Sequence, residues 1–203
     1  MRPNPSGSME PAIRYRTAKR QPLVRDFSNL ENPIVIRFIN ADTEEKLFAI
    51  LKVFGLPSPK PERYKESQAN VETRAHIVEG QRIFRRLLEM AGSGEVTKAA
   101  KAVNTLSITA RPMVENSRGK PRPILSADKL LSFMQMEVWM VAVSGARIGR
   151  CEYCGDVFLT GKLTENRATR IYCSDKHRVA GNRAKAKNKK GPGAVRHRGQ
   201  GSA

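Results

Sequence analysis

The chain has 203 residues, of which 39% are hydrophobic, and its excess of Lys and Arg over Asp and Glu gives a formal net charge of +18. The length suits one or two domains, and no apolar run is long enough to predict a transmembrane helix. The charge predicts attraction to polyanions, such as nucleic acid or an anionic membrane surface, although a solvated basic protein without such a partner would share this composition.

Residues 1–32 are basic and are interrupted by Pro3, Pro5, Pro11 and Pro22, which predicts a flexible extended arm. The first twenty residues lack the apolar segment of a signal peptide. The three cysteines cannot all pair within one chain, so they favour a reducing compartment. We therefore expect a cytoplasmic protein, associated with the nucleoid if it binds DNA.

Residues 33–39 are apolar and largely β-branched, which predicts a short strand. Asp42 or Thr43 is expected to cap a helix that begins with Glu44 and ends before Gly55. Residues 62–91 predict one long helix, and residues 95–106 a shorter one. The buried side of the long helix is expected to carry Val71, Ala75, Val78, Ile83, Leu87 and Met90.

Residues 107–114 predict a strand, and the turn signal that ends at Gly119 predicts that the chain returns as a second strand over 122–125. Pro121 and Pro123 suggest that this second strand is an edge strand. Ser126 is expected to cap a helix that runs to residue 144. Residues 33–149 thus predict a mainly helical domain with one short strand and a β-hairpin, within an α+β fold.

All three cysteines lie in one short stretch, with the pattern Cys-x2-Cys, eighteen residues, then Cys-x3-His. These four residues are Cys151, Cys154, Cys173 and His177. Thiolates with one imidazole suit tetrahedral Zn2+, and a full set of four ligands indicates one structural zinc ion rather than a catalytic one. A Cys151–Cys154 disulfide would leave Cys173 unpaired, and the strand-to-helix pattern of a thioredoxin-like redox site is missing.

The same spacing predicts a treble-clef-like zinc finger over residues 150–190. A tight knuckle from Cys151 to Cys154, turned by Gly155, precedes a strand over 157–159. A loop over 161–170 leads to a return strand over 171–172, and Ser174 or Asp175 caps a helix that runs to about residue 188. Phe158 and Ile171 are expected to form its small core, so metal binding must supply folding energy.

Three motifs carry a resemblance to a known family: CEYCG at residues 151–155, YCS at 172–174 and GNRAKAK at 181–187. They resemble the CGNR-type zinc finger of bacterial proteins, which follows a mostly helical, stress-associated region called the ABATE domain. The expected order of elements in residues 33–149 is similar to that region. The family motif begins with cysteine, whereas this chain has Ala180, so His177 is the candidate replacement ligand. The resemblance implies DNA binding and transcriptional regulation.

No acidic residue follows Asp175, so the expected C-terminal helix is basic, and residues 191–203 are expected to form a flexible basic tail. Arg178, Asn182, Lys185 and Lys189 fall on one stripe of this helix. Such side chains can neutralise phosphates, and Asn and Arg can also read base edges. The candidate nucleic-acid-binding residues are Arg178, Asn182, Arg183, Lys185, Lys187, Lys189 and Lys190.

Duplex DNA is favoured over RNA because few aromatic residues are interleaved with the basic ones. The alternatives are RNA binding, or a protein-interaction adaptor in which zinc only stabilises the fold. Self-association through the helical domain would suit a regulator. No pair of carboxylates and no His-based nucleophile pattern suggests a catalytic site, so we expect neither an enzyme nor a membrane partner.

Overall fold

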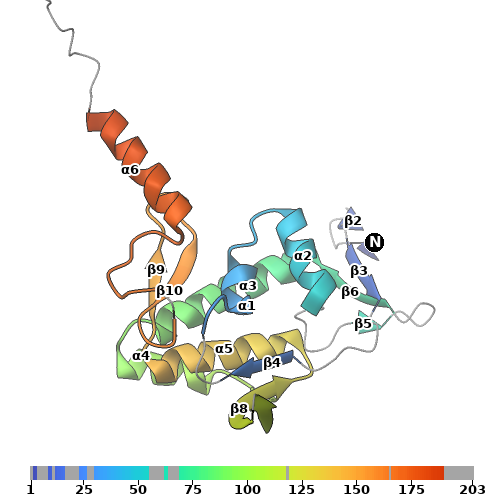
Figure 1. Cartoon of the computed structure of the whole chain (residues 1–203). Helices are drawn as coiled ribbons and strands as arrows, with labels where there is room; N and C mark the ends of the chain where they lie inside the picture. Colours follow the sequence, from blue (N-terminus) through green and yellow to red (C-terminus); the bar gives the residue numbers. More distant parts are fainter. Residues whose placement is uncertain are drawn as a thin grey trace, which may run out of the picture.

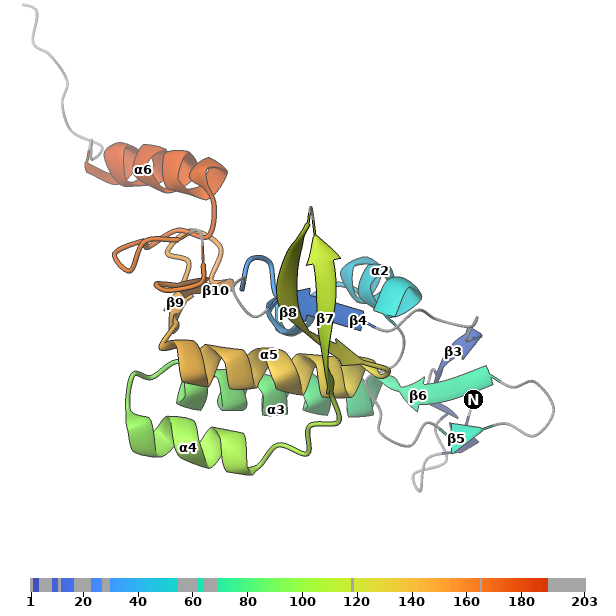
Figure 2. The same cartoon turned by 60° about the horizontal axis from the view of Figure 1, so that its bottom comes forward.

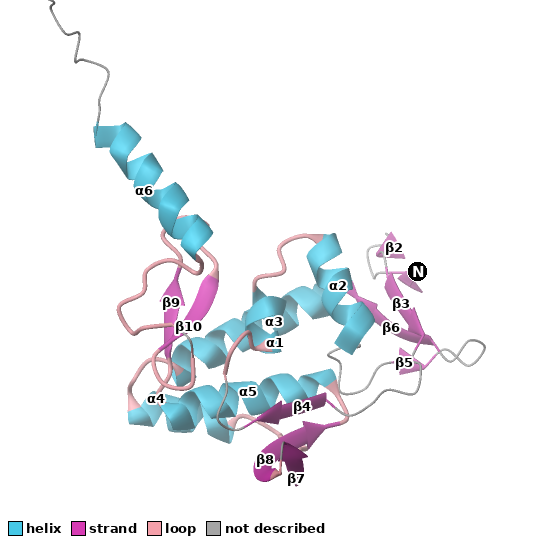
Figure 3. Ribbon diagram, in the orientation of Figure 1, coloured by secondary structure: helices cyan, strands magenta, loops and turns pink. Residues whose placement is uncertain are grey.

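The computed structural model describes residues 30–54, 74–117, 119–164 and 166–189, together with strand residues at 2–3, 9–10, 12–16, 23–26, 62–63 and 69–73. The fold mixes helices with small antiparallel sheets, as expected for an α+β chain (Figure 1, Figure 3). Within these residues, every helix is too short or too polar to cross a lipid bilayer. The tail at 191–203 and Lys190 lie outside the described residues.

Helices form the body of the molecule. α3 (Arg74–Ala91), α4 (Val96–Asn104) and α5 (Leu130–Ser144) pack against one another, as Figure 2 shows, and α1 (Ile34–Ile39) packs against α3 and α5. α2 (Glu44–Phe54) follows α1. The helices predicted over residues 44–54 and 95–106 are therefore confirmed. The centre of the core contains Phe38, Leu51, Ile77, Phe84, Leu88, Met134 and Val138.

The strand predicted over residues 33–39 is wrong, because these residues form the helix α1. Five of its six side chains are buried, so α1 is apolar on nearly all sides. Periodicity cannot distinguish a short helix of this kind from a buried strand, and β-branched residues then favour the strand. In the folded protein, the tertiary environment of these residues stabilises the helix instead of the strand.

Glu137 of α5 supplies that environment. Its carboxylate is fully buried and accepts hydrogen bonds from the backbone N–H groups of Ile34 (3.0 Å) and Val35 (2.7 Å). It also accepts a hydrogen bond from the guanidinium of Arg25. Burial raises the pKa of Glu137, and Arg25 and the two amides oppose that rise. The carboxylate thus caps the first turn of α1, where the helix dipole favours negative charge.

The N-terminal part of the long helix predicted over residues 62–91 is also wrong where the structure describes it. It contains β5 (Glu62–Arg63) and β6 (Ala69–Thr73), and helix α3 begins only at Arg74. β6 pairs with β3 (Ala12–Arg16) from the N-terminal arm. Because the pairing partner lies more than fifty residues upstream, the local sequence could not reveal it.

The buried face of α3 differs from the predicted one by about one residue along the helix. Ile77, Phe84, Leu88 and Ala91 are buried, whereas Val78 and Ile83 are 43% and 50% exposed. Leu87 and Met90 are partly buried against the core. Gly80 lies against the ring of Phe38. The side of α3 that packs against the body is therefore slightly different from the side that the apolar pattern predicted.

The predicted β-hairpin is present as β7 (Arg111–Ser117) and β8 (Lys120–Ala127). β8 is the central strand of its sheet, not an edge strand, because β4 (Leu23–Asp26) pairs with its last four residues. Pro121 and Pro123 lie in the part of β8 that pairs only with β7, so no ladder hydrogen bond is lost to β4. Ser126 lies in β8, and the N-cap of α5 is Lys129 instead.

The N-terminal arm contains further strands, β1 (Arg2–Pro3) and β2 (Met9–Glu10), which pair with each other. Together with β3 and β4, they place strand residues in a segment that was expected to be an extended arm. Arg25 of β4 also reaches the buried Glu137. At least this part of the arm belongs to the folded body.

Residues 147–189, called here the C-terminal module, follow α5. β9 (Arg147–Arg150) pairs antiparallel with β10 (Val157–Thr160), and α6 (Asp175–Lys189) ends the module. The predicted partner for residues 157–159 was the segment 171–172, which is not a strand. The turn at Cys151–Gly155 folds β10 back onto the residues that precede it, so β10 pairs with β9 instead.

Candidate metal centre

The knuckle between the first two cysteines forms as predicted. The N–H of Gly155 donates to the carbonyl of Cys151 (2.8 Å), and the N–H of Cys151 donates to the carbonyl of Asp156 (2.9 Å). Gly155 has a φ of 77°, a conformation that residues with a side chain rarely adopt. The N–H of Asp156 donates to Cys154 Sγ (3.4 Å). The turn therefore holds both thiols at the end of the β9–β10 ribbon.

The other two residues of the cluster come from the start of α6. Ser174 caps the helix, because its hydroxyl accepts a hydrogen bond from the N–H of His177 (3.2 Å). Cys173 precedes the cap, and His177 lies in the first turn. The N–H of Glu152 donates to the carbonyl of Ile171 (3.1 Å), which ties the knuckle to the segment that leads into α6.

The structure brings Cys151, Cys154, Cys173 and His177 together, with every ligand atom within 4.8 Å of the others. Cys154 Sγ lies 3.7 Å from Cys173 Sγ, and Cys151 Sγ lies 3.8 Å from His177 Nδ1. Bonds of about 2.3 Å to a tetrahedral ion would separate two sulfurs by about 3.8 Å. The separation of Cys173 Sγ and His177 Nδ1 is shorter, at 2.9 Å. The cluster can hold a metal ion.

The charge balance of the thiols supports that fit. Burial raises the pKa of the Cys151 thiol, but hydrogen bonds from the backbone at Cys173, Cys154 and Tyr153 outweigh it and lower this pKa to about 6. Burial, together with the nearby Cys151 and Cys173 thiols, raises the pKa of Cys154 to about 12. Three thiolates therefore cannot share this space alone, and a bound cation would relieve their repulsion.

A small apolar cluster lies next to the metal centre, and Cys151 belongs to both. It consists of Cys151, Phe158 and Tyr172, all at most 5% exposed. The predicted core residue Ile171 is instead 47% exposed, and its neighbour Tyr172 points inward. Sequence alternation could not decide between these two residues, because residues 171–172 do not form a strand.

Two glycines allow close packing around this cluster. A Cβ at Gly181 would lie 2.6 Å from the ring of Tyr172, and a Cβ at Gly149 would lie 2.8 Å from the ring of Phe158. Neither separation is sterically acceptable, so α6 can approach Tyr172 only where it has no side chain. This contact gives a physical reason for the glycine in the GNR motif, which sequence reasoning had not identified.

The module also shares the core of the helical body. Val157 and Leu159 of β10 belong to the main buried cluster, whereas Phe158 points to the small one. This division follows from the alternation of side chains along a strand. Asn40, at the end of α1, forms two hydrogen bonds with the backbone of Val157. The local sequence carries no signal for Asn40, because its role depends on a partner 117 residues away.

Asn166 makes several hydrogen bonds within the described part of the loop that follows β10. Its side chain donates to the carbonyl of Leu159 (2.8 Å) and accepts a hydrogen bond from Arg170, and its backbone carbonyl accepts from the N–H of Gly161 (2.8 Å). Arg170 also donates from Nε to the carbonyl of Tyr172 (2.7 Å). These contacts link β10 to the segment that carries Cys173.

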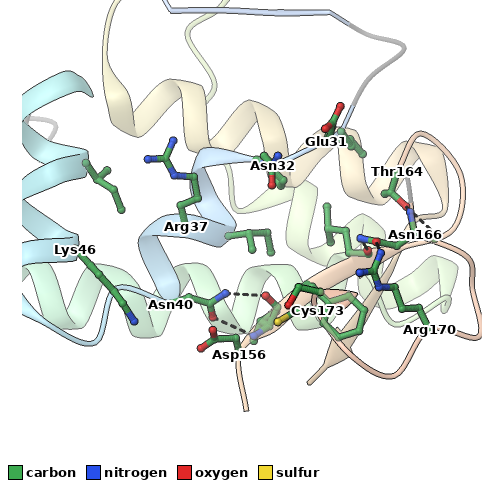
Figure 4. A pocket seen from close by; sticks show the side chains of 18 of the residues that line it. Glu31, Asn32, Arg37, Asn40, Lys46, Asp156, Thr164, Asn166, Arg170 and Cys173 are labelled. Atoms are coloured by element: carbon green, nitrogen blue, oxygen red, sulfur yellow. Dashed lines mark hydrogen bonds between the residues drawn. The ribbon is translucent and has the colours of Figure 1, made fainter. Parts of the chain in front are cut away.

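A cavity of about 590 Å³ lies between the body and the C-terminal module, as Figure 4 shows. Arg37 and Lys46 contribute to its wall from the body, and Asp156, Arg170 and Cys173 contribute from the module. Lys46 is paired with Asp42 (2.6 Å). The mixture of cations and carboxylates does not select one class of ligand.

Apart from Lys190, which lies outside the described residues, the predicted nucleic-acid-binding residues lie on α6, which projects away from the body (Figure 1). Arg178 pairs with Asp175 (3.3 Å), and Lys185 pairs with Glu152 of the knuckle (2.6 Å). Asn182, Arg183 and Lys187 are exposed, and Lys189 is the last residue of the helix. The Lys185–Glu152 pair adds a second link between α6 and the knuckle.

Comparisons with models of protein families, with curated proteins and with solved structures found no match to this chain.

Proposed function

We propose that this protein is a zinc-stabilised, DNA-binding regulator of transcription. The observation that carries the proposal is the position of the Cys3His cluster at the base of an exposed, basic helix. Cys151 and Cys154 come from the knuckle, whereas Cys173 and His177 come from the start of α6. A metal ion held by all four residues would therefore fix the direction in which α6 projects.

The donor set favours zinc among the common metals, because three thiolates and one imidazole suit a tetrahedral ion. Zinc bound here would act as a structural cross-link and would contribute to folding free energy. The order of knuckle, strand and helix along the chain supports a treble-clef-like module. In this module the two strands of the ribbon lie on either side of the knuckle in the sequence, with β9 before it and β10 after it. The motifs around residues 151–155, 172–174 and 181–187 support a relationship to the CGNR type, with His177 as the replacement ligand.

Nucleic acid is the partner that α6 fits best. The helix contains no acidic residue after Asp175, so its exposed cations would be attracted to phosphates. Lys176 and Lys187 are exposed, and neither has an ion-pair partner among the residues that the structure describes. Such cations can neutralise phosphates without first breaking a contact within the protein.

The test is fluorescence anisotropy of a labelled DNA duplex with the full, zinc-loaded chain over a range of salt concentrations. We expect binding that weakens as salt increases and that is lost when a chelator removes the zinc. Replacing both Lys176 and Lys187 with Ala should weaken binding and reduce the slope of log affinity against log salt by about two.

The matched control removes the same charge from the helical body. Lys98 and Lys101 are exposed lysines on α4, and their double replacement with Ala should leave the affinity and salt slope almost unchanged. If both double variants weaken binding equally, the attraction is a property of total charge rather than of α6. Binding that survives zinc removal would contradict the role of the metal centre.

A further inference from the structure

The distal half of α6 makes few contacts with the rest of the described chain. Gly181 is the one buried residue among residues 175–188 of the helix, and residues 182–188 are all exposed. Figures 1 and 2 show the helix extending away from the β9–β10 ribbon. A polar helix that is exposed on all sides gains little from packing, so its structure suggests a surface that is completed by a partner.

The buried Gly181 defines which side of α6 faces the module. At about 100° per residue, Asn182, Ala186, Val179 and Arg183 lie about 100–200° around the helix from Gly181. These four residues are called here the outer ridge, and all are exposed. Val179 is 41% exposed although it is the largest apolar residue in α6. The ridge combines small apolar side chains with one amide and one guanidinium, and Asp175 in the first turn of α6 lies in the same angular sector.

Cations lie on both flanks of the outer ridge. Arg178 and Lys185 lie on one side, about 70–110° from the centre of the ridge, and Lys176 and Lys187 lie at a similar angle on the other. The first flank is next to the knuckle, where Lys185 contacts Glu152. The second flank faces away from it. A ligand that meets the ridge would therefore encounter cations on both sides, held in exposed ion pairs on the first flank and without an ion-pair partner among the described residues on the second.

We propose that α6 enters the major groove of duplex DNA with its outer ridge toward the base edges and its two flanks toward the phosphates of the two strands. This inference rests on the proposed function and specifies the form of nucleic acid and the reading face. A helix fits the major groove, which is about 12 Å wide, and the small ridge side chains allow close approach.

The ridge residues then have distinct roles. Asn182 matches the donor and acceptor edge of adenine, and Arg183 matches the two acceptors of guanine. Val179 and Ala186 suit apolar contact with the methyl group of thymine. The flanking cations contribute affinity without sequence preference. Specificity should therefore depend on the ridge, and salt dependence on the flanks.

Single strands fit this surface less well. Proteins that bind single-stranded nucleic acid usually stack bases on aromatic side chains. α6 contains no Phe, Tyr or Trp, and its one imidazole, His177, belongs to the Cys3His cluster. Cations on both flanks also match two phosphate backbones better than one.

Two alanines on α6 provide a matched test of the reading face. Ala186 lies on the outer ridge, whereas Ala184 lies on the opposite side of the helix, and both are exposed. Ala186→Asp and Ala184→Asp change the net charge equally. In the zinc-loaded full chain, we expect Ala186→Asp to weaken duplex binding at least about tenfold, and Ala184→Asp less than about threefold. Far-UV circular dichroism and zinc content should be unchanged in both.

Competition identifies the groove. Methyl green, which occupies the major groove, should displace the wild-type protein, whereas netropsin, which occupies the minor groove, should not. Equal weakening by the two Asp variants, displacement by netropsin alone, or equal affinity for single strands would overturn the inference while leaving DNA binding intact. If the wild-type chain binds no nucleic acid at all, the proposed function itself fails.

Discussion

The side chain of Asn40 forms two hydrogen bonds with the backbone of Val157. Its Nδ2 donates to the carbonyl of Val157 (2.7 Å), and its Oδ1 accepts from the N–H of the same residue (3.0 Å). One amide side chain thus satisfies both backbone groups that Val157 presents on the free edge of β10. The contact joins the end of α1 to the C-terminal module at the strand that follows the knuckle.

Replacing Asn40 with Ala should reduce the free energy of unfolding by about 1–3 kcal/mol, because two partly buried backbone groups lose their partners. Urea denaturation followed by circular dichroism measures this change. Asn104→Ala serves as the control, since Asn104 is an exposed residue at the end of α4. Equal stability of the two variants would show that the Asn40 contact contributes nothing.

The metal centre predicts a selective effect of histidine replacement. His177→Ala removes one of four donors, so this variant should lose zinc to a chelator concentration that the wild type withstands. Elemental analysis after dialysis gives the zinc content per chain. His76→Ala, on α3 outside the cluster, should retain zinc like the wild type. Equal retention by the two variants would remove His177 from the ligand set.

Gly181→Ala should destabilise the protein although alanine favours helices more than glycine does. The added Cβ would meet the Tyr172 ring at 2.6 Å, so α6 or the ring must move. We expect a loss of about 1–3 kcal/mol in thermal or urea unfolding. Asn182→Ala, one residue further along, is exposed and should not lose stability. A stabilising effect of Gly181→Ala would argue against the close contact with Tyr172.

Glu137→Ala should have the largest effect on stability among these variants. It removes the acceptor for Arg25 and for the first N–H groups of α1, and it leaves these donors with little access to water. Breaking a buried pair in this way typically costs about 3–5 kcal/mol. The midpoint and slope of urea unfolding measure the loss. Glu115→Ala, an exposed change on β7, should be nearly neutral.

Several elements were predictable because their signals are local. The capping residue, the apolar face and the glycine that follows the helix predicted α2. The turn at Gly119 predicted the β7–β8 hairpin. The knuckle at Cys151–Gly155 and the first turn of α6 depend on residues a few positions apart. The Cys3His cluster was found for the same reason, since each half of it is set by local geometry.

Errors occurred where a distant partner decides the conformation. Residues 33–39 have the composition of a buried strand, but Glu137, about one hundred residues later, accepts their first N–H groups and stabilises a helix. Residues 69–73 pair with residues 12–16 and so leave the predicted helix. The prolines of β8 indicated an edge strand, yet β4 covers the end of β8 beyond them.

The sequence alone determined the four candidate ligands, their division between a knuckle and a helix start, and the basic character of α6. These features depend on covalent spacing and on short-range hydrogen bonds. Only the tertiary structure decided how the module is attached to the body and which side of α6 is free. Those properties depend on Asn40, Tyr172 and Gly181, whose contacts form between segments that the local sequence does not place together.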